Sequence, residues 1–310
     1  MEVRSVAIIG LGLLGGSIGL AVREHLPGVH TTGFDADAAT RTRAAARGLV
    51  EKVHDNAADA VRDADLVILC VPVGAMGDAA RAMAGALKPG VLVSDVGSSK
   101  QTVTAALAEA LPGVSIIPAH PVAGTEHSGP DAGFASLFRQ RWCIITPPEV
   151  ANLVHLTALV TFWEALGANV EVMSPGHHDL VLAVTSHLPH LIAYTIVGTA
   201  SDLEDVTRSE VIKYSAGGFR DFTRIAASDP TMWRDVFRSN RDAVLEMLDT
   251  FSDDLDRLKT AIRDRDGQTL FDHFTRTRAI RRSIIAEGQD DARPDFGRAD
   301  HAGADHDGTE

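Results

Sequence analysis

A glycine-rich segment after the first apolar run constrains the fold of this chain more than any other feature. Residues 6–9 read Val-Ala-Ile-Ile and lead directly into Gly10-Leu-Gly12-Leu-Leu-Gly15, after which a helical pattern begins. Asp35 follows the next strand-like run, 20 residues past Gly15. A strand, three glycines at this spacing, a helix and a later acid form the fingerprint of a dinucleotide-binding βαβ unit.

Each residue of this fingerprint has its own physical task. Gly10 permits the tight turn, Gly12 lets the backbone approach a pyrophosphate, and Gly15 allows the helix to pack closely on the strand. The helix N-terminus, which includes Leu13 and Leu14, offers free N–H groups and the positive end of the helix dipole to the anion. These residues are therefore predicted to bind the cofactor.

Asp35 indicates which dinucleotide is bound. Its carboxylate is expected to accept hydrogen bonds from both ribose hydroxyls of an adenosine, and it would repel a 2′-phosphate, so the sequence favours NAD. Arg41 and Arg43 lie close enough in sequence to leave NADP as the alternative. Pro72, at the end of a later strand, is a further predicted cofactor contact.

The first half of the chain alternates strand and helix patterns, which predicts βαβ units and a parallel, Rossmann-type doubly wound α/β sheet. The expected strands are residues 6–9, 31–34, 66–71 and 91–95, and the expected helices are 17–25, 38–47, 76–87 and 100–110. Further strands at 114–118, 142–146 and 169–173 are expected to extend the same sheet, with a helix at 150–166.

Beyond residue 173 the apolar residues recur at helical spacing, over 179–200, 236–263 and 267–286. We therefore predict a dinucleotide-binding domain over 1–173 and an all-helical substrate and dimerisation domain over 174–286. Residues 287–310 carry eight acids, two arginines and almost no apolar side chains, which predicts a disordered acidic tail.

Composition narrows the range of partners. The net charge of −13 argues against binding to a nucleic-acid backbone. The polar residues 1–5 do not resemble a signal peptide, so a cytoplasmic protein is expected. Residues 180–198 are apolar enough to raise the question of a membrane span, but polar residues and Pro189 interrupt them, so a buried core helix without membrane contact is predicted.

Four polar clusters lie outside what a nucleotide-binding fold requires. They are Asp95-Val-Gly-Ser98-Ser99-Lys100, the loop-like stretch from Pro118 to Pro130, Thr185-Ser186-His187-Leu188-Pro189-His190, and the stretch from Ser215 to Arg224, with residues 229–233 shortly after. A histidine at a strand end, such as His120, can accept a proton from a hydroxyl during hydride removal, and Glu126 is placed to orient it. An arginine such as Arg224 can hold a carboxylate through two hydrogen bonds.

The histidines of the third cluster are open to another interpretation. His187 and His190, together with His177, His178 and Asp179, could be read as metal ligands. No metal-binding motif is present and Pro189 distorts the helix, so hydrogen bonding to a polar substrate is preferred and no metal site is predicted.

The chain resembles the prephenate dehydrogenase family over nearly its whole ordered length. The motifs that carry the resemblance are GLGLLGGS with Asp35, DVGSSK, HPVAGTEHSG, SHLPH and GGFRDFTRIAASDPTMWRD, in that order. The resemblance implies an NAD-dependent oxidoreductase of tyrosine biosynthesis that converts prephenate to 4-hydroxyphenylpyruvate and carbon dioxide, and it implies a homodimer formed through the helical domain.

The resemblance also implies roles for individual residues. His120 would deprotonate the ring hydroxyl with the help of Ser98, while Thr125, Glu126, His190 and Arg224 would contact the substrate. Glu126 and Asp221 would form a gating ionic network. Family members often have valine where this chain has Ser99, which leaves open whether Ser98 or Ser99 faces the substrate.

Two other functions remain as alternatives. Arogenate differs from prephenate only by an amino group in place of the keto group, so arogenate dehydrogenase is the nearest rival. An NAD-dependent binding module without turnover is a more remote one. A 3-hydroxyacid dehydrogenase is disfavoured because Lys213 lies outside any matching motif.

Overall fold

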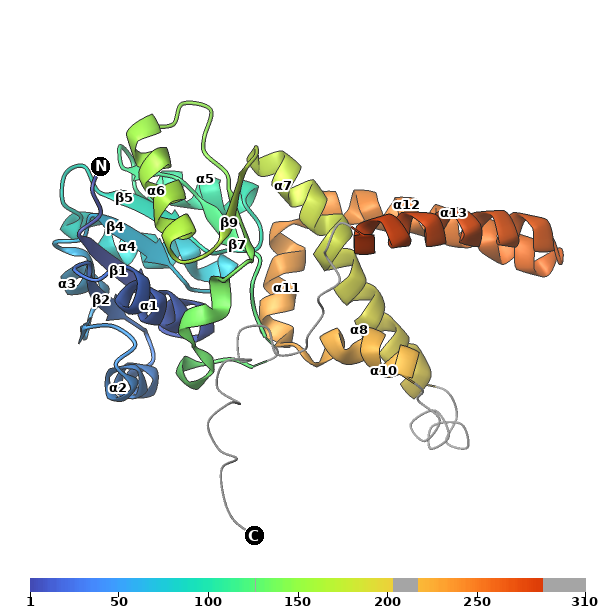
Figure 1. The fold of residues 1–310 in the computed structure, drawn as a ribbon, viewed down its shortest axis with the longest axis horizontal. Coiled ribbons are helices and arrows are strands. Elements are labelled where there is room, and N and C mark those ends of the chain that lie inside the picture. Colours follow the sequence, from blue (N-terminus) through green and yellow to red (C-terminus); the bar gives the residue numbers. More distant parts are fainter. Residues whose placement is uncertain (126, 203–216, 287–310) are drawn as a thin grey trace, which may run out of the picture. The chain divides into compact units, whose positions relative to one another are not determined.

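The structure, a computed structural model, describes residues 1–125, 127–202 and 217–286. The chain divides into two compact units, Met1–Val244 and a second that begins at Leu245. The predicted tail at 287–310, Glu126 and Lys213 lie outside the described residues. Figure 1 follows the chain through its elements.

The first unit is built on a six-stranded parallel sheet with strand order β3-β2-β1-β4-β5-β6. The strands are β1 (Ser5–Ile9), β2 (His30–Phe34), β3 (Lys52–Val53), β4 (Leu66–Leu69), β5 (Leu92–Asp95) and β6 (Ser115–Ile116). Along the chain, strands are first added on one side of β1 (β2 and β3) and then on its other side (β4, β5 and β6), as in a doubly wound sheet. The predicted Rossmann-type fold is confirmed.

Helices cover both faces of this sheet (Figure 1). They are α1 (Leu13–His25), α2 (Ala38–Arg47), α3 (Ala57–Val61), α4 (Met76–Met83) and α5 (Gln101–Ala110). Successive side chains of β1 enter opposite cores, since Val6 and Ile8 pack with α1 whereas Ala7 and Ile9 pack with α3, α4 and α5. Burial on both faces explains why the strands read as continuous apolar runs.

A separate three-stranded sheet corrects one expectation. The strands predicted at 142–146 and 169–173 do not extend the parallel sheet; they form β8 (Trp142–Ile145) and β9 (Asn169–Val172) beside β7 (Ala119–Pro121). Pro118 separates β6 from β7 and has no N–H with which to continue the ladder. β7 then pairs antiparallel with β8, so His120 lies within a strand rather than in a loop after one.

The helix α6 (Leu153–Ala165) connects β8 to β9 and buries Leu159, Phe162 and Trp163 in the same core as α1. It begins three residues later than predicted because Asn152 caps it, accepting hydrogen bonds from the backbone N–H groups of Val154 and His155.

The described residues of the first unit beyond β9 are mostly helical, but two of the predicted helices are interrupted. The apolar run at 179–200 forms α7 (Pro175–Leu182), a π-helical turn (Ala183–His187) and α8 (Leu188–Ser201). Pro189 has no N–H to donate to the preceding helical turn. The missing hydrogen bond is accommodated by the wider π turn, which lies immediately before the proline. The chain continues through α10 (Gly217–Thr223), a 3-10 turn (Arg224–Ala227) and α11 (Pro230–Ser239).

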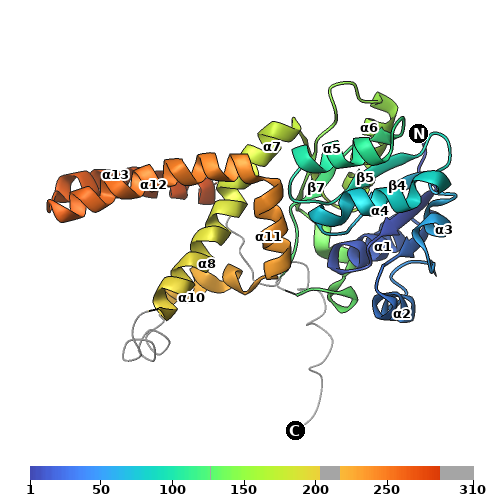
Figure 2. The same cartoon turned by 180° about the vertical axis from the view of Figure 1, so that it is seen from behind.

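The run predicted as one helix over 236–263 breaks at Asn240, whose φ of −105° and ψ of 33° are not helical. The second unit contains most of α12 (Arg241–Arg263) and all of α13 (Gly267–Ala286). These two helices run along each other in both views (Figures 1 and 2). α13 has the predicted bounds.

One helical stretch, Pro175–Ser201, is long and apolar enough to cross a membrane by length and composition, and 28% of its most apolar window is buried. His178, Asp179 and His187 lie on its buried side, while Val184, Ile196 and Val197 are exposed. The stretch was expected to be a buried core helix, but only one of its sides is buried.

Candidate active site

The turn between β1 and α1 has the geometry of a pyrophosphate cradle. Gly10 has a φ of +101°, and a Cβ there would lie 2.5 Å from the carbonyl oxygen of Cys70. A Cβ on Gly15 would lie 1.9 Å from the carbonyl oxygen of Gly10, so close packing of helix and strand requires glycine at both positions. A Cβ on Gly12 would meet nothing within 4 Å, which leaves its backbone accessible to a ligand.

The N-terminus of α1 suits an anion. Leu13 and Leu14 are its first residues, Gly12 provides no side-chain cap, and the first turn holds no acidic residue. The positive end of the helix dipole is therefore not neutralised by the helix itself. Pro72 lies beyond the carboxyl end of β4, the strand next to β1, where it caps a short 3-10 turn.

Asp35 is held at the carboxyl end of β2 by two backbone donors. Its Oδ2 accepts a hydrogen bond from the Leu11 N–H at 2.8 Å, and its Oδ1 accepts one from the Asp37 N–H at 2.9 Å. Arg41 donates to the carbonyl oxygens of Asp35 and Ala36 at 2.8 and 3.1 Å. Arg43 pairs with Asp131 at 2.7 Å, so both arginines near the acid already have protein partners.

A chain of three buried side chains connects β7 to α7. The Nδ1 atom of His120 lies 2.9 Å from Nε2 of His178, and Nδ1 of His178 lies 2.8 Å from Oδ1 of Asp179. His120 comes from β7 and the other two residues from α7. Only His120 retains measurable exposure, at 8%.

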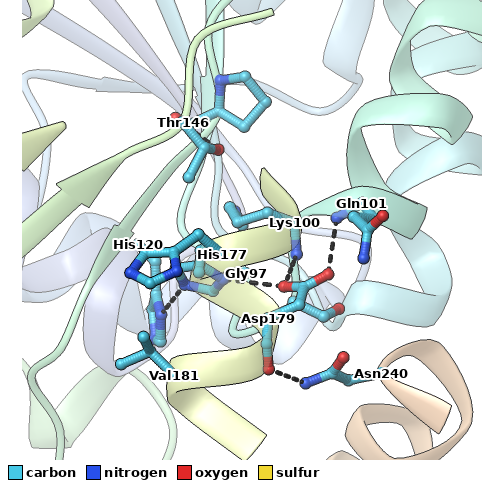
Figure 3. Close-up of polar contacts among 12 residues, drawn as sticks. Gly97, Lys100, Gln101, His120, Thr146, His177, Asp179, Val181 and Asn240 are labelled. Carbon is cyan, nitrogen blue, oxygen red and sulfur yellow. Dashed lines mark hydrogen bonds and ion pairs between the residues drawn. The ribbon is translucent and has the colours of Figure 1, made fainter. Parts of the chain in front are cut away.

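Asp179 is the fixed end of this chain (Figure 3). Its carboxylate accepts the backbone N–H groups of Lys100 and Gln101 at 2.7 and 2.9 Å, at the start of α5. Burial would raise its pKa, but the hydrogen bonds from His178 and from these two N–H groups hold the pKa below its usual value. Asp179 is therefore ionised at neutral pH.

The two imidazoles are neutral. Burial lowers the pKa of His120 well below 6.5, and the neighbouring His178, Lys100 and His187 lower it further. Burial also lowers the pKa of His178, although Asp179 opposes the shift. A neutral imidazole can accept a proton, which is the state a general base requires.

Lys100 fixes the strand that carries His120. Its ammonium group is fully buried, pairs with Asp95 at the end of β5, and donates to the carbonyl oxygen of Ala119 at 2.7 Å. Burial raises the pKa of Asp95 and lowers that of Lys100, and each charge opposes the shift of the other. The pair joins β5, α5 and β7 at the site.

The two serines of the DVGSSK motif have different surroundings. The Oγ atom of Ser99 lies 2.8 Å from Oγ of Ser239, at the end of α11, and Ser99 is fully buried. Ser98 is half-buried. This geometry favours Ser98 over Ser99 as the hydroxyl available to a substrate.

A second group of polar side chains continues from the first. Asn240 donates from Nδ2 to the carbonyl oxygen of Asp179 at 2.8 Å and lies 3.0 Å from Nδ1 of His187. The ring of His190 stacks on Trp233 at 3.7 Å. Burial lowers the pKa of His190, the hydrogen bond with the Ser186 carbonyl raises it, and the positive charge of Arg224 lowers it. Arg224 itself is exposed at the start of the 3-10 turn.

The structure also places two further predicted residues, Thr125 and Asp221. Thr125 is half-buried in the loop after β7, where its Oγ1 accepts the His127 N–H at 3.2 Å. Asp221 is exposed on α10. The prediction for Glu126 falls outside the described residues.

Four contributors were not predicted: His178, Asp179, Lys100 and Asn240. The sequence suggested His178 and Asp179 as possible metal ligands or substrate contacts, not as partners of His120, and no group of metal-ligating side chains is found among the described residues. The sequence did contain a signal for this pair. An aspartate that is buried in an apolar helix needs a polar partner, and the residue before Asp179 is a histidine.

Comparison with known proteins agrees with this geometry. The family model described as "Prephenate dehydrogenase, nucleotide-binding domain" matches residues 18–172, and the model described as "Prephenate dehydrogenase, dimerization domain" matches residues 174–276.

Individual relatives match over most of their length. Cyclohexadienyl dehydrogenase of Zymomonas mobilis is 46% identical over 91% of this chain and 96% of its own. Prephenate dehydrogenase of Bacillus subtilis is 33% identical over 87% of this chain and 73% of its own. The crystal structure of Aquifex aeolicus prephenate dehydrogenase, in complex with hydroxyphenyl propionate and NAD+, has a TM-score of 0.86 at 31% identity and covers 92% of this chain and 99% of that one. The chain therefore belongs to the prephenate dehydrogenase family of oxidoreductases.

Proposed function

We propose that this enzyme catalyses the NAD-dependent oxidative decarboxylation of prephenate to 4-hydroxyphenylpyruvate, a step in tyrosine biosynthesis. The observation that carries the proposal is a buried, neutral His120 that is held through His178 by a fixed carboxylate, in the same compact unit as a dinucleotide cradle. Similarity to the Bacillus and Aquifex prephenate dehydrogenases supports the choice of substrate.

NAD is the proposed cofactor, and it would supply the hydride acceptor when bound. Gly12 and the start of α1 would hold its pyrophosphate, and Asp35 would hold the adenosine ribose. Arg41 and Arg43 are engaged with backbone carbonyls and with Asp131, so neither is poised to receive a 2′-phosphate. This arrangement supports NAD over NADP.

The proposed reaction balances without net uptake or release of a proton. His120 accepts the proton of the ring hydroxyl as hydride leaves the same ring carbon, and a ring carbonyl forms. The bond to the ring carboxylate then breaks, carbon dioxide leaves, and the electron pair passes through the ring to the oxygen. His120 returns the proton to that oxygen, which gives the phenol.

The other predicted residues keep their proposed roles. Ser98 would help to place the hydroxyl, while Thr125, Glu126 and His190 would contact the substrate. Arg224 would hold a substrate carboxylate, since a guanidinium pairs with carboxylates through two parallel hydrogen bonds. Glu126 and Asp221 would form a gating ionic network.

Arogenate is the less favoured substrate, because the relatives compared above are named for prephenate or, more broadly, for a cyclohexadienyl substrate. A module that binds NAD without turnover is also disfavoured, because Asp179, His178 and His120 form an intact chain that a binding protein would not need.

Steady-state kinetics test the proposal. NADH formation is followed at 340 nm with prephenate and with arogenate, each with NAD and with NADP. Prephenate with NAD is expected to give the highest kcat/KM, and His120→Asn is expected to lower kcat about 100-fold or more with little change in KM. Absence of NADH formation with either substrate would overturn the proposal, and an unchanged kcat in His120→Asn would remove His120 from the chemistry.

We also propose a cytoplasmic homodimer that uses the helical domain for assembly. The family model that matches residues 174–276 is described as a dimerization domain, which supports this assembly and the boundary after residue 173. Large apolar side chains on α12 and α13 are exposed, namely Leu245, Leu255, Ile262, Phe271, Phe274, Ile280 and Ile284. A second copy covering them would remove apolar surface from water.

A further inference from the structure

We infer that His178 is a positioning residue which, together with Asp179, holds His120 in the tautomer that leaves Nε2 without a proton. The inference rests on the proposed role of His120 as the base. It adds the reason why one particular nitrogen of that ring is ready to accept the substrate proton.

The contact with Asp179 fixes the proton of His178 on Nδ1. An ionised carboxylate can only accept hydrogen bonds, so the 2.8 Å contact between Asp179 Oδ1 and His178 Nδ1 requires the proton to be on Nδ1. A neutral imidazole carries one N–H, and His178 is neutral because burial lowers its pKa. Nε2 of His178 is therefore an acceptor.

His178 in turn fixes the proton of His120. Its Nδ1 atom lies 2.9 Å from Nε2 of His178, and a hydrogen bond at this distance needs one proton between the two nitrogens. Since Nε2 of His178 has none, His120 must donate from Nδ1. A neutral His120 then has its free lone pair on Nε2.

The carboxylate at the origin of this chain is itself fixed. Its Oδ2 accepts the Gln101 N–H and its Oδ1 accepts the Lys100 N–H, so neither oxygen is free to rotate away from His178. The amide of Asn240 binds the main-chain oxygen of Asp179 as well (Figure 3). His178 and Asp179 are both fully buried, which prevents water from replacing either partner.

The same contact persists once the proton arrives. Protonated His120 would still donate from Nδ1 to Nε2 of His178, so the ring would keep its orientation. His178, Lys100 and His187 all oppose a positive charge on His120, while Asp95 neutralises Lys100. Protonated His120 would therefore return its proton readily.

The tautomer can be measured directly in the wild-type protein. Nitrogen-15 NMR of histidine-labelled enzyme distinguishes a protonated ring nitrogen from a bare one, and comparison with His120→Asn assigns the signals. Above the pKa of His120, we expect Nδ1 to be protonated and Nε2 bare. A signal showing the proton on Nε2 would overturn the inference, whether or not the enzyme oxidises prephenate.

Two substitutions of His178 provide the kinetic test. In His178→Asn the amide can replace Nδ1 toward Asp179 but is too short to reach His120, so kcat is expected to fall about 100-fold with KM within about twofold. In His178→Gln the longer amide can present its oxygen to Nδ1 of His120, so kcat is expected to recover to within about tenfold of wild type. The matched control is His177→Asn, at an exposed histidine one residue earlier in the same helix.

The pattern of outcomes separates positioning from a purely structural role. A loss of kcat in both variants with equal loss of thermal stability, or an unchanged kcat in His178→Asn, would overturn the positioning role. Failure of wild-type enzyme to use prephenate would count against the proposed function alone, since the NMR measurement tests the tautomer without substrate.

Discussion

At the scale of single residues, the site depends on side chains whose charge state is set by burial. His120 is the clearest case, because its neutral form is favoured by desolvation and by three neighbouring groups. The fingerprint glycines are equally specific, since two of them occupy positions where any Cβ would strike a backbone carbonyl.

The lowered pKa of His120 predicts an unusual pH profile. The base must be neutral, so kcat/KM for prephenate falls as the pH drops through the pKa of His120 in the free enzyme. Because this pKa lies well below 6.5, we expect kcat/KM to be constant from neutral pH down past 6.5 and to decline only at lower pH.

Rates measured between pH 4.5 and 8, with thermal unfolding followed in the same buffers, test this profile. His120→Asn is the control, and its residual activity should lack the acidic decline. A decline centred at or above pH 6.5 in the wild type would contradict the assignment.

The glycine-rich turn and His120 could be singled out from sequence as candidate site residues because their motifs are local. The partner of His120 could not, because His178 lies 58 residues away in the chain and only the packing of α7 against the strands brings the rings together. Similarly, Ser98 and Ser99 are adjacent and chemically alike, and only the contact of Ser99 with Ser239 separates them.

At the scale of elements, the site depends on how two sheets are joined. Lys100 precedes α5 and links Asp95 on β5 to the main chain of β7, which carries His120. The longer elements of the parallel sheet could be predicted because their apolar patterns are local. β3 and α3, with two and five residues, are too short to show such a pattern and were not predicted.

The second sheet and the interrupted helices could not be predicted in this way. β7 has only three residues, too few to show alternation, and its pairing with β8 crosses more than twenty residues of chain. The breaks at the π turn and at Asn240 leave the helical spacing of apolar residues almost unchanged, so periodicity does not reveal them.

The buried ion pair gives a prediction about stability. Lys100→Met would leave Asp95 buried without its cation, which typically costs about 3–5 kcal/mol in free energy of unfolding. The double variant Asp95→Asn with Lys100→Met removes both charges and is expected to recover part of that loss.

Urea denaturation followed by circular dichroism measures these changes, with similar slopes expected for all variants. A single variant as stable as the wild type would show that the pair does not hold β5 and β7 together. As a control, Arg81→Met breaks the exposed pair with Asp78 and should change stability by less than about 1 kcal/mol.

At the scale of the whole molecule, the sequence predicted a Rossmann-type sheet followed by helices, and the structure confirms it. The sequence pattern did not show that the helical stretch Pro175–Ser201 is buried on one side only. Its exposed apolar side chains, and those of α12 and α13, agree with an enzyme that assembles through its helices.

Charged side chains introduced into the proposed interface should dissociate the dimer. Phe271 and Phe274 are 65% and 56% exposed on α13, so replacing both by Asp is expected to convert a dimer into a monomer. Sedimentation velocity at several concentrations gives the mass, and Ala45→Asp on the exposed side of α2 controls for the added charge. A wild-type monomer, or a double variant that remains dimeric, would contradict the proposed interface.

A crystal structure of the enzyme with NAD and hydroxyphenyl propionate tests the central claim most directly. We predict that the phenolic oxygen lies within hydrogen-bonding distance of Nε2 of His120, that Nδ1 of the same ring remains on His178, and that Arg224 contacts the propionate carboxylate. A phenolic oxygen bound away from His120, or His120 turned so that Nε2 faces His178, would contradict it.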